Sequence, residues 1–310
     1  MTASTVLLKA PIIFQVPPTN HASSPFENCL LSWEQNALII SPRTSNAEPE
    51  IPALRNETWL RDCLQHSPVK RVYLDPELEA SKFKAWADVC SAANKKVYLK
   101  VPSAPDLPQT RQPILWRVKR LADWFVALLL CTLLSPLMGI LAIGVRLDSR
   151  GPVLFRQWRV GYQGRLFQIC KFRSMETDAE ARHHKVMENQ TGLHKLEIDP
   201  RVTRVGRWLR KFSLDELPQL LNVLRGEMSL VGPRPWAIYD AVRIEPLLQR
   251  RLRALPGMTG MWQVTTRSHG CDLTSVNRMD LDYLQQWTFQ ADLKLLLLTV
   301  PKVVTGFGAY

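Results

Sequence analysis

Two adjacent carboxylates, Asp215 and Glu216, are the residues of this sequence whose neighbours best suit chemistry. Arg210 precedes them, and Arg225 and Arg234 follow. A carboxylate can attack phosphorus or hold a metal ion, and an arginine can bind two oxygens of one phosphate at once. Neighbouring residues of a helix project about 100° apart, so the two carboxylates can take different tasks. The pattern therefore favours chemistry on a phosphate.

A helix cap is the structural alternative. Ser213 and Glu216 form an S-x-x-E pattern, which is typical of a capping box. Pro218 fits the first turn of a helix that continues through Leu224, which places both carboxylates at the positive end of the helix dipole, where they should stay ionised. A cap does not account for the rigid VGPRP turn that holds Arg234 between two prolines. The residue types alone leave both interpretations open.

Composition narrows the class of protein. The chain has 310 residues, 46% of them hydrophobic, which is enough for about two domains with a sizeable core. The formal net charge of +12 indicates an anionic partner, such as nucleic acid, an acidic membrane face or a phosphorylated substrate. The six cysteines form no CxxC pair, so we expect neither a zinc site nor a disulfide framework, and a reducing compartment fits best. The apolar start, broken by Lys9, Pro11 and Pro17, is a poor signal peptide.

The first third of the chain predicts a separate module. Residues 1–34 show no sustained periodicity and are expected to be loose. Residues 35–101 alternate short strands with helices, which favours a small, Rossmann-like parallel α/β module. Residues 41–45 contain no glycine, so a structural or regulatory module is favoured over a nucleotide site. Residues 102–113 contain four prolines and are interpreted as a linker with few contacts across it, which leaves 114–310 as the second domain.

The second domain begins with a candidate membrane segment. Residues 124–145 carry no charge, and a straight helix of that length would cross the roughly 30 Å hydrocarbon core, so a single-pass anchor is one interpretation. Ser135 and Pro136 near the middle favour a bend, because proline removes a backbone hydrogen bond. Basic flanks favour a re-entrant hairpin over 121–145 that enters and leaves on one face, since positive charge stays cytoplasmic. The flanking basic residues are Arg117, Lys119, Arg120, Arg146, Arg150, Arg156 and Arg159.

A strand pair is predicted over residues 151–175. Alternating residues form the strands, and Gly161 and Gly164 form the turn between them. Lys171 and Arg173 at the end of the second strand could meet a phosphate. An exposed basic strand face is the simpler alternative.

Further segments complete the domain. Residues 201–210 repeat arginine at every third position around Trp208, which indicates an amphipathic helix that lies on an anionic membrane surface or forms a solvated helical face. Residues 236–255 predict a helix. Residues 295–298 are too short an apolar run to cross a membrane and are expected to be packed or interfacial. Three histidines lack metal-site spacing and are interpreted as surface residues: His183, His184 and His194.

From about residue 119 to residue 310 the sequence resembles the bacterial sugar transferases. These are monotopic phosphoglycosyl transferases that start polysaccharide assembly on a polyprenyl carrier lipid. KFSLDELPQLLNVLRGEMSLVGPRP carries the core motif, LPGMTGMWQVTTRS is similar to the family's PG-TG-x-x-QV-x-x-R element, and Asp280 and Asp292 stand at family positions. The resemblance implies an α+β membrane-associated catalytic domain after the α/β module, with a re-entrant membrane helix hairpin and amphipathic interfacial helices.

The resemblance also implies roles for individual residues. Asp215 is the implied nucleophile, and Glu216 is the implied ligand of Mg²⁺. Thr266 stands where many relatives have glycine, so the loop around Arg267 is expected to differ in shape. The residues implied to bind substrate or phosphate are Lys171, Arg173, Arg210, Arg234 and Arg267. The residues implied for the membrane hairpin are Lys119, Arg120, Asp123, Ser135 and Pro136.

The implied reaction transfers a sugar 1-phosphate from a nucleoside diphosphate sugar, expected to be a UDP-sugar, to an undecaprenyl-type phosphate. It releases UMP through a covalent aspartyl-phosphosugar intermediate. The expected partners are both substrates, the lipid bilayer, downstream glycosyltransferases and a second copy of the chain, and the expected location is the cytoplasmic face of the inner membrane. A non-catalytic scaffold that recruits glycosyltransferases is the alternative, which the intact Asp215, Glu216 and Arg234 argue against. Nucleic-acid binding would rest on net charge alone.

Overall fold

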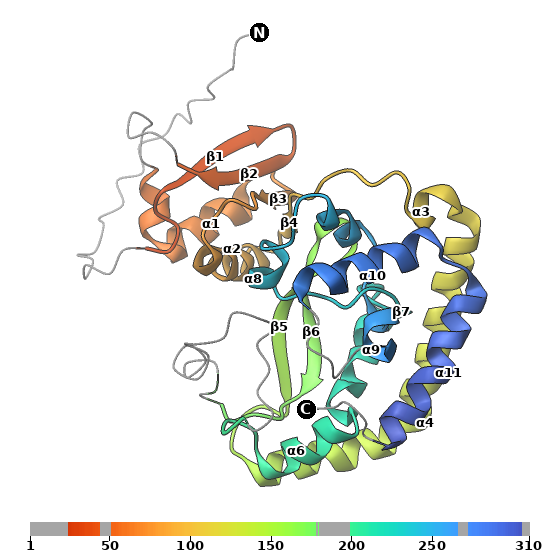
Figure 1. Cartoon of the computed structure of the whole chain (residues 1–310). Coiled ribbons are helices and arrows are strands. Elements are labelled where there is room, and N and C mark those ends of the chain that lie inside the picture. Colours follow the sequence, from red (N-terminus) through yellow and green to blue (C-terminus); the bar gives the residue numbers. More distant parts are fainter. Residues whose placement is uncertain (1–23, 44–50, 178, 180–198, 266–271, 306–310) are drawn as a thin grey trace.

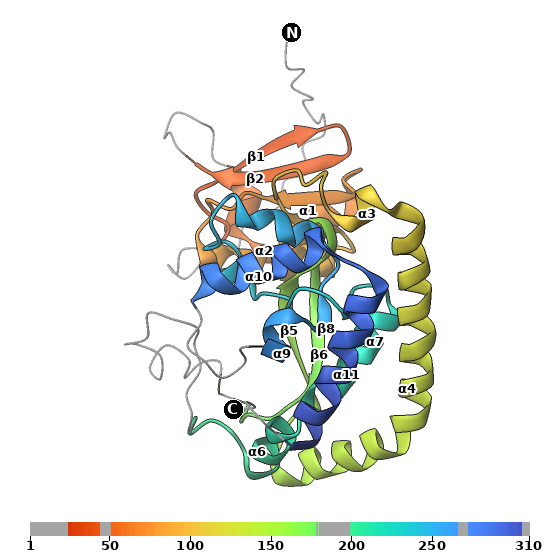
Figure 2. The same ribbon diagram turned by 45° about the vertical axis from the view of Figure 1, so that its right-hand side comes forward.

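The computed structural model combines a small N-terminal module with a larger mixed domain and one very long helix (Figures 1 and 2). Residues 1–23, the three histidines considered above, Thr266 and Arg267 lie outside the part of the chain that the structure describes. The described residues are 24–43, 51–177, 179, 199–265 and 272–305.

The N-terminal module is a four-stranded sheet with helices α1 (Glu57–His66) and α2 (Ala80–Ala92). Its last three strands are parallel, as the alternation of strands and helices predicts, and β1 pairs antiparallel with β2. In chain order, which is also their order in the sheet, the strands are β1 (Cys29–Glu34), β2 (Ala37–Pro42), β3 (Arg71–Leu74) and β4 (Lys96–Leu99). Because β1 lies within residues 1–34, the later part of that segment is ordered and adds an edge strand.

The module packs directly on the second domain, which begins with the antiparallel pair β5 (Leu154–Val160) and β6 (Leu166–Phe172). Trp86 of α2 belongs to the same buried hydrophobic cluster as Val160 of β5 and Ile238 of α8 (Ile238–Ala241). Trp158 donates a hydrogen bond from Nε1 to Asp88 Oδ1 at 2.7 Å. The two parts therefore share one core.

The segment interpreted as a linker is packed as well. Leu107 is fully buried, and α3 (Pro108–Arg111) follows it directly. Arg253 of the second domain donates hydrogen bonds to the carbonyl oxygens of Val101 and Pro102 at 2.9 Å. Prolines restrict the backbone without preventing burial, and here they lead into a helix rather than separating two bodies.

Helix α4 (Pro113–Asp148) is a single bent helix of 36 residues that includes the predicted membrane segment. Both views show it running along one side of the molecule and then turning beneath it (Figures 1 and 2). Pro136 has no N–H to bond the carbonyl oxygen of Thr132, and the Ser135 hydroxyl donates to that oxygen at 2.8 Å instead. The Ser-Pro pair therefore allows a bend without leaving this carbonyl unsatisfied.

Most of the apolar surface of α4 faces outward. Within the described part of the chain, α4 is the one helix long and apolar enough to cross a membrane. Only 11% of its most apolar stretch of 18 residues is buried in the protein. Helix α11 (Phe289–Thr305) lies beside its first arm in both views and adds exposed Leu293 and Leu297. The exposed apolar residues of α4 include Leu121, Phe125, Leu129, Leu133, Ile140 and Ile143.

The rest of the second domain consists of short elements around β5 and β6. The helix predicted over 236–255 is wrong: α8 and the 3-10 helix η4 (Leu248–Arg253) replace it, and Pro246 between them disfavours a continuous helix. The remaining elements are α6 (Arg204–Lys211), the 3-10 helix η3 (Leu214–Gln219), α7 (Leu220–Leu224), the parallel strands β7 (Ser229–Val231) and β8 (Gly257–Thr259), α9 (Met261–Thr265) and α10 (Leu273–Gln285).

We expect a chain that begins at Gln112 to be markedly less stable than the full chain, because truncation exposes Val160 and Ile238. Exposing one buried aliphatic side chain costs about 1.5–3 kcal/mol. Melting temperature and monomer yield in detergent measure the effect. Trp158→Phe is the milder comparison, because it removes the hydrogen bond to Asp88 but keeps a ring, at a cost of about 1 kcal/mol. A truncated chain with an unchanged melting temperature would show that the shared core contributes little.

Candidate active site

The two carboxylates lie on the 3-10 helix η3, in its first turn. The predicted helix through Leu224 is present, but its first part is the 3-10 helix η3, and Pro218 lies near the end of that part rather than in the first turn. Proline has no N–H to bond the carbonyl of Leu214, so a tighter 3-10 turn precedes α7. Ser213 has left-handed backbone (φ 53°), and its side chain does not cap η3, so the capping box is not formed. Only 8% of the surface of Asp215 is exposed, whereas a carboxylate that caps a surface helix can remain in contact with water.

Two predicted basic residues lie beside these carboxylates. Lys171 Nζ, at the end of β6, is 2.6 Å from Glu216 Oε1. Arg210, at the end of α6, donates a hydrogen bond from Nε to Ser174 Oγ at 2.8 Å. Burial lowers the pKa of Arg210, and the charge of Asp215 opposes this effect, so the two side chains are electrostatic neighbours. The structure therefore brings strand β6, helix α6 and helix η3 together at one site.

Arg173, predicted to bind phosphate, makes its contacts elsewhere. Its Nη2 donates to the carbonyl oxygen of Ser149 at 2.6 Å and to the Ser149 hydroxyl at 2.8 Å. Burial lowers the pKa of Arg173, with a further lowering from Arg146. Arg173 thus braces the end of α4 against β6, and these hydrogen bonds are with Ser149 rather than with Asp215 or Glu216.

Arg159 is a site residue that the sequence interpretation counted only as a flanking charge. Burial lowers its pKa; Tyr239, Asp240 and Glu216 oppose that effect, whereas Arg234 adds to it. Its Nη2 donates to Gln157 Oε1 at 2.6 Å. The pairing of the two strands β5 and β6 could have identified Arg159 from the sequence.

Strand register explains how Arg159 could have been found. Residues two apart in a strand lie on one face, and β5 pairs with β6 so that Phe155 faces Lys171 and Arg159 faces Phe167. Arg159 and Lys171 therefore share a face of the hairpin. Counting outward from the turn at Gly161 would have placed them together.

Arg234 completes the cationic side of the site. It follows β7 in the VGPRP turn, and its guanidinium lies 5.3 Å from the centre of the Trp262 ring. The charges of Arg234 and Glu216 both act on Arg159, which places the three residues in one neighbourhood. Arg267 falls outside the described residues.

Two carboxylates surrounded by cations suit an anionic ligand with a bound metal better than a metal held by protein alone. Among the described residues, no group of three or more His, Cys, Asp or Glu side chains is placed to hold a metal ion. Mg²⁺ commonly uses one or two carboxylates, with substrate phosphates and water as its other ligands. Glu216 and Asp215 fit that partial set.

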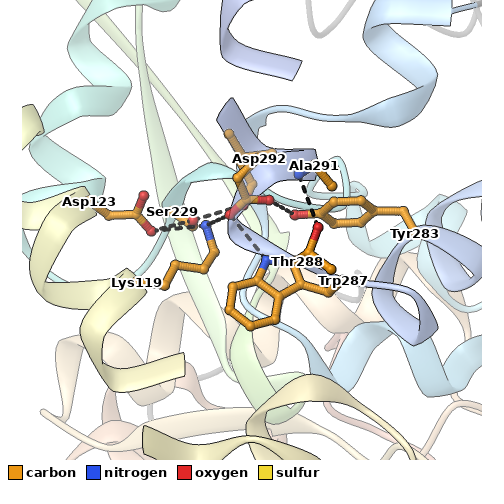
Figure 3. A network of polar contacts seen from close by, with 9 residues as sticks. Lys119, Asp123, Ser229, Tyr283, Trp287, Thr288, Ala291 and Asp292 are labelled. Carbon is orange, nitrogen blue, oxygen red and sulfur yellow. Dashed lines mark hydrogen bonds and ion pairs between the residues drawn. The ribbon is translucent and has the colours of Figure 1, made fainter. Parts of the chain in front are cut away.

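A buried polar network ties the long apolar helix α4 to the rest of this domain (Figure 3). Lys119 Nζ lies 2.6 Å from Asp292 Oδ2 and 3.3 Å from Asp123 Oδ2. Ser229 Oγ, on β7, is 2.5 Å from Asp123 Oδ2. Lys119, Asp123 and Asp292 therefore form an internal, paired cluster, while Arg120 beside it is exposed.

Both carboxylate oxygens of Asp292 accept hydrogen bonds as well. Tyr283 donates its hydroxyl to Asp292 Oδ1 at 2.5 Å, and Trp287 donates Nε1 to Asp292 Oδ2 at 3.1 Å. Thr288 Oγ1 accepts from the N–H of Ala291 at 3.1 Å in the first turn of α11 (Figure 3). The network thus joins α4, β7, α10 and α11.

The comparisons cover the second domain. A family model described as bacterial sugar transferase matches residues 114–306. The UDP-glucose:undecaprenyl-phosphate glucose-1-phosphate transferase of Caulobacter vibrioides is 46% identical over 200 residues, which cover 62% of this chain and 72% of the relative. Galactosyl transferase CpsE of Streptococcus agalactiae is 43% identical over 191 residues, 59% of this chain and 41% of the relative. The Escherichia coli protein with the same name as the Caulobacter relative is 40% identical over 201 residues, 62% and 41%. The chain thus spans less than half of two of these relatives.

We expect Lys119→Met to destabilise the protein strongly, because it leaves Asp123 and Asp292 buried without their cation. Removing one partner of a buried ion pair costs about 3–5 kcal/mol. Arg120→Met is the matched control: it removes a neighbouring but exposed cation and should change stability by less than about 0.5 kcal/mol. Thermal melting in detergent compares them. Equal melting temperatures would show that the network does not stabilise the fold.

Proposed function

The chain belongs to the bacterial sugar transferase family, and on that premise we propose that it transfers a sugar 1-phosphate from a UDP-sugar to undecaprenyl phosphate. The relatives named above carry such activities in their names. The observation that supports the proposal most directly is the carboxylate pair of η3, buried Asp215 and half-buried Glu216, with Lys171 and Arg210 beside it. An anionic diphosphate would supply the negative charge that this cationic site can compensate.

Asp215 is the proposed nucleophile. Its carboxylate oxygen attacks the phosphorus that bears the sugar, and the bond from that phosphorus to the bridging oxygen breaks. UMP leaves, and an aspartyl-phosphosugar intermediate remains. An oxygen of the lipid phosphate then attacks the same phosphorus, which restores the Asp215 carboxylate and forms the lipid diphosphate sugar. Each step exchanges one phosphorus–oxygen bond for another.

The surrounding cations stabilise charge on the phosphoryl oxygens. Arg210 and Arg234 are proposed to bind the oxygens that do not react, and Arg159 is added to them because its charge acts on the same carboxylate, Glu216. Lys171 holds the Glu216 carboxylate in place through their 2.6 Å contact. Glu216 is the residue proposed to hold Mg²⁺, which when bound offsets charge on the diphosphate.

The contacts of α4 support a location for this reaction at the membrane surface. Both arms of α4 return to the same domain: Lys119 and Asp123 bind α11 and β7, whereas Asp148 near the other end accepts a hydrogen bond from the N–H of Val205 of α6. Two ends fixed to one body favour the re-entrant arrangement over a single-pass anchor. The site would then lie at headgroup depth on the cytoplasmic face, where the carrier phosphate is. Exposed Trp208 on α6 suits the same interface.

The two carboxylates should respond differently to substitution. We expect Asp215→Asn to abolish turnover and the covalent intermediate, because an amide lacks the attacking anion. Glu216→Gln should instead raise the Mg²⁺ requirement and keep the ability to form the adduct at high metal concentration. The measurement is mass spectrometry of protein mixed with UDP-sugar and Mg²⁺ without lipid acceptor, read on the peptide that contains Asp215.

Two outcomes would contradict this assignment. Substantial turnover by correctly folded Asp215→Asn would exclude Asp215 as the nucleophile. A sugar-phosphate adduct that maps to another peptide would do the same.

A panel of UDP-sugars tested in parallel would identify the donor.

Both ends of α4 should be labelled from the cytoplasmic side. Leu115→Cys and Arg150→Cys, each in a background without other cysteines, should react alike with an impermeant thiol reagent in sealed vesicles. Arg150 is preferred to Gly151, where φ is +122° and a Cβ would lie 2.3 Å from Arg173 Nη1. Labelling from opposite faces would make α4 a single-pass anchor. Pro136→Leu should shift labelling toward that form, because it restores the helical N–H.

A further inference from the structure

One buried ion pair lies against the backbone of Arg234. Arg251 Nη2 donates to the carbonyl oxygen of Arg234 at 2.7 Å and to Asp280 Oδ2 at 2.7 Å. The backbone N–H of Arg234 also lowers the pKa of Asp280, which places that N–H on the side of the same carboxylate. The carbonyl of Arg234 is therefore bonded to the pair, and its N–H lies near it.

The pair comes from two elements that otherwise lie outside the site. Arg251 belongs to η4 and Asp280 to α10, and their side chains are each 1% exposed. The Arg251 guanidinium lies 5.6 Å from the centre of the Trp236 ring, and Trp236 donates Nε1 to Asn277 Oδ1 at 2.8 Å. These contacts fix the pair on the side of the VGPRP turn that faces the core.

Stability alone is a weak reason for this arrangement. Burying two charges costs desolvation energy that their attraction offsets only when the geometry and the remaining hydrogen bonds are good. Burial raises the pKa of Asp280 and lowers that of Arg251, and each charge opposes the shift of the other. Within the described part of the chain, Arg251 Nε and Nη1 have no hydrogen-bond partner. An apolar pair of similar volume would serve the core as well.

We propose that Arg251 and Asp280 are positioning residues that fix the peptide of Arg234 and thereby orient its guanidinium toward the diphosphate. The identity of the ligand in this proposal rests on the proposed function, whereas the geometry of the Arg251–Asp280 pair and the Arg234 backbone does not. Arg234 lies in a short turn, and its side chain reaches the site across the Trp262 ring. A small displacement of its Cα would therefore misplace the guanidinium, and misplacement by about 1 Å can cost a hundredfold in rate.

The test replaces the pair as a unit. The double variant Arg251→Met with Asp280→Leu removes both charges at similar volume, so it avoids the unpaired buried charge that each single variant leaves. We expect it to fold and to lose about 10- to 100-fold in kcat/KM for UMP release from UDP-sugar. Val276→Ala on α10 is the control, because Val276 is a buried residue of the same helix, and its replacement opens a cavity but leaves the Arg251–Asp280 pair and the bond to Arg234 in place.

A second background shows whether the loss acts through Arg234. In Arg234→Ala the same double replacement should change kcat/KM by less than about twofold, because the group that it positions is already absent. An equal loss in both backgrounds would overturn the proposal. So would an equal loss in the Val276→Ala control.

Hydrogen exchange separates this proposal from the proposed function. The amide of Arg234 should exchange faster in the double variant than in the wild type or in Val276→Ala, whatever reaction the protein catalyses. If the exchange rate is unchanged, the proposal that Arg251 and Asp280 fix the Arg234 peptide is overturned, even if the enzyme transfers sugar phosphate. If exchange is faster but the wild-type protein releases no UMP, the positioning role stands and the proposed reaction is overturned.

Discussion

The ammonium of Lys119, buried between Asp123 and Asp292, is the interaction on which the arrangement of the second domain depends. It joins the first arm of α4 to α11, and through Ser229 to the strand β7. The VGPRP turn follows that strand directly, so the same few residues fix both the membrane helix and Arg234. One cation cannot neutralise two carboxylates. Hydrogen bonds from a serine, a tyrosine and a tryptophan make up the difference.

Buried Arg251 and the half-buried Arg159 and Arg210 have two different kinds of surroundings. Arg251 has its own carboxylate, and the pair belongs to the core. Arg159 and Arg210 are also desolvated, but they gather around carboxylates that a substrate and a metal would share. Burial lowers the pKa of all three, yet arginine starts so high that each stays charged. A site built in this way keeps its positive charge ready before an anion arrives, which is the condition for electrostatic preorganisation.

The sequence predicted most of the local structure, because local structure depends on short-range patterns. Strand alternation gave the β5–β6 hairpin, and the parallel strands of the module followed from their alternation with helices. It failed where distant segments meet. Nothing local distinguishes a proline-rich linker from one that buries Leu107, nor a headgroup-level Asp123 from one paired with Ser229, more than a hundred residues away. Arg173 matched the motif, yet its partner is Ser149.

The proposed re-entrant arrangement of α4 has a mechanical consequence for the bilayer. A helix held to the body by both arms and entering from one side would add its cross-section to one leaflet alone. That leaflet would have to expand relative to the other, which would favour convex curvature or loosely packed lipids on the side of the proposed active site. Because the Ser135 hydroxyl satisfies the Thr132 carbonyl that Pro136 leaves free, this oxygen would not draw water into the hydrocarbon. The bent part of α4 can therefore stay free of water, and lipid packing rather than hydration would determine its depth in the bilayer.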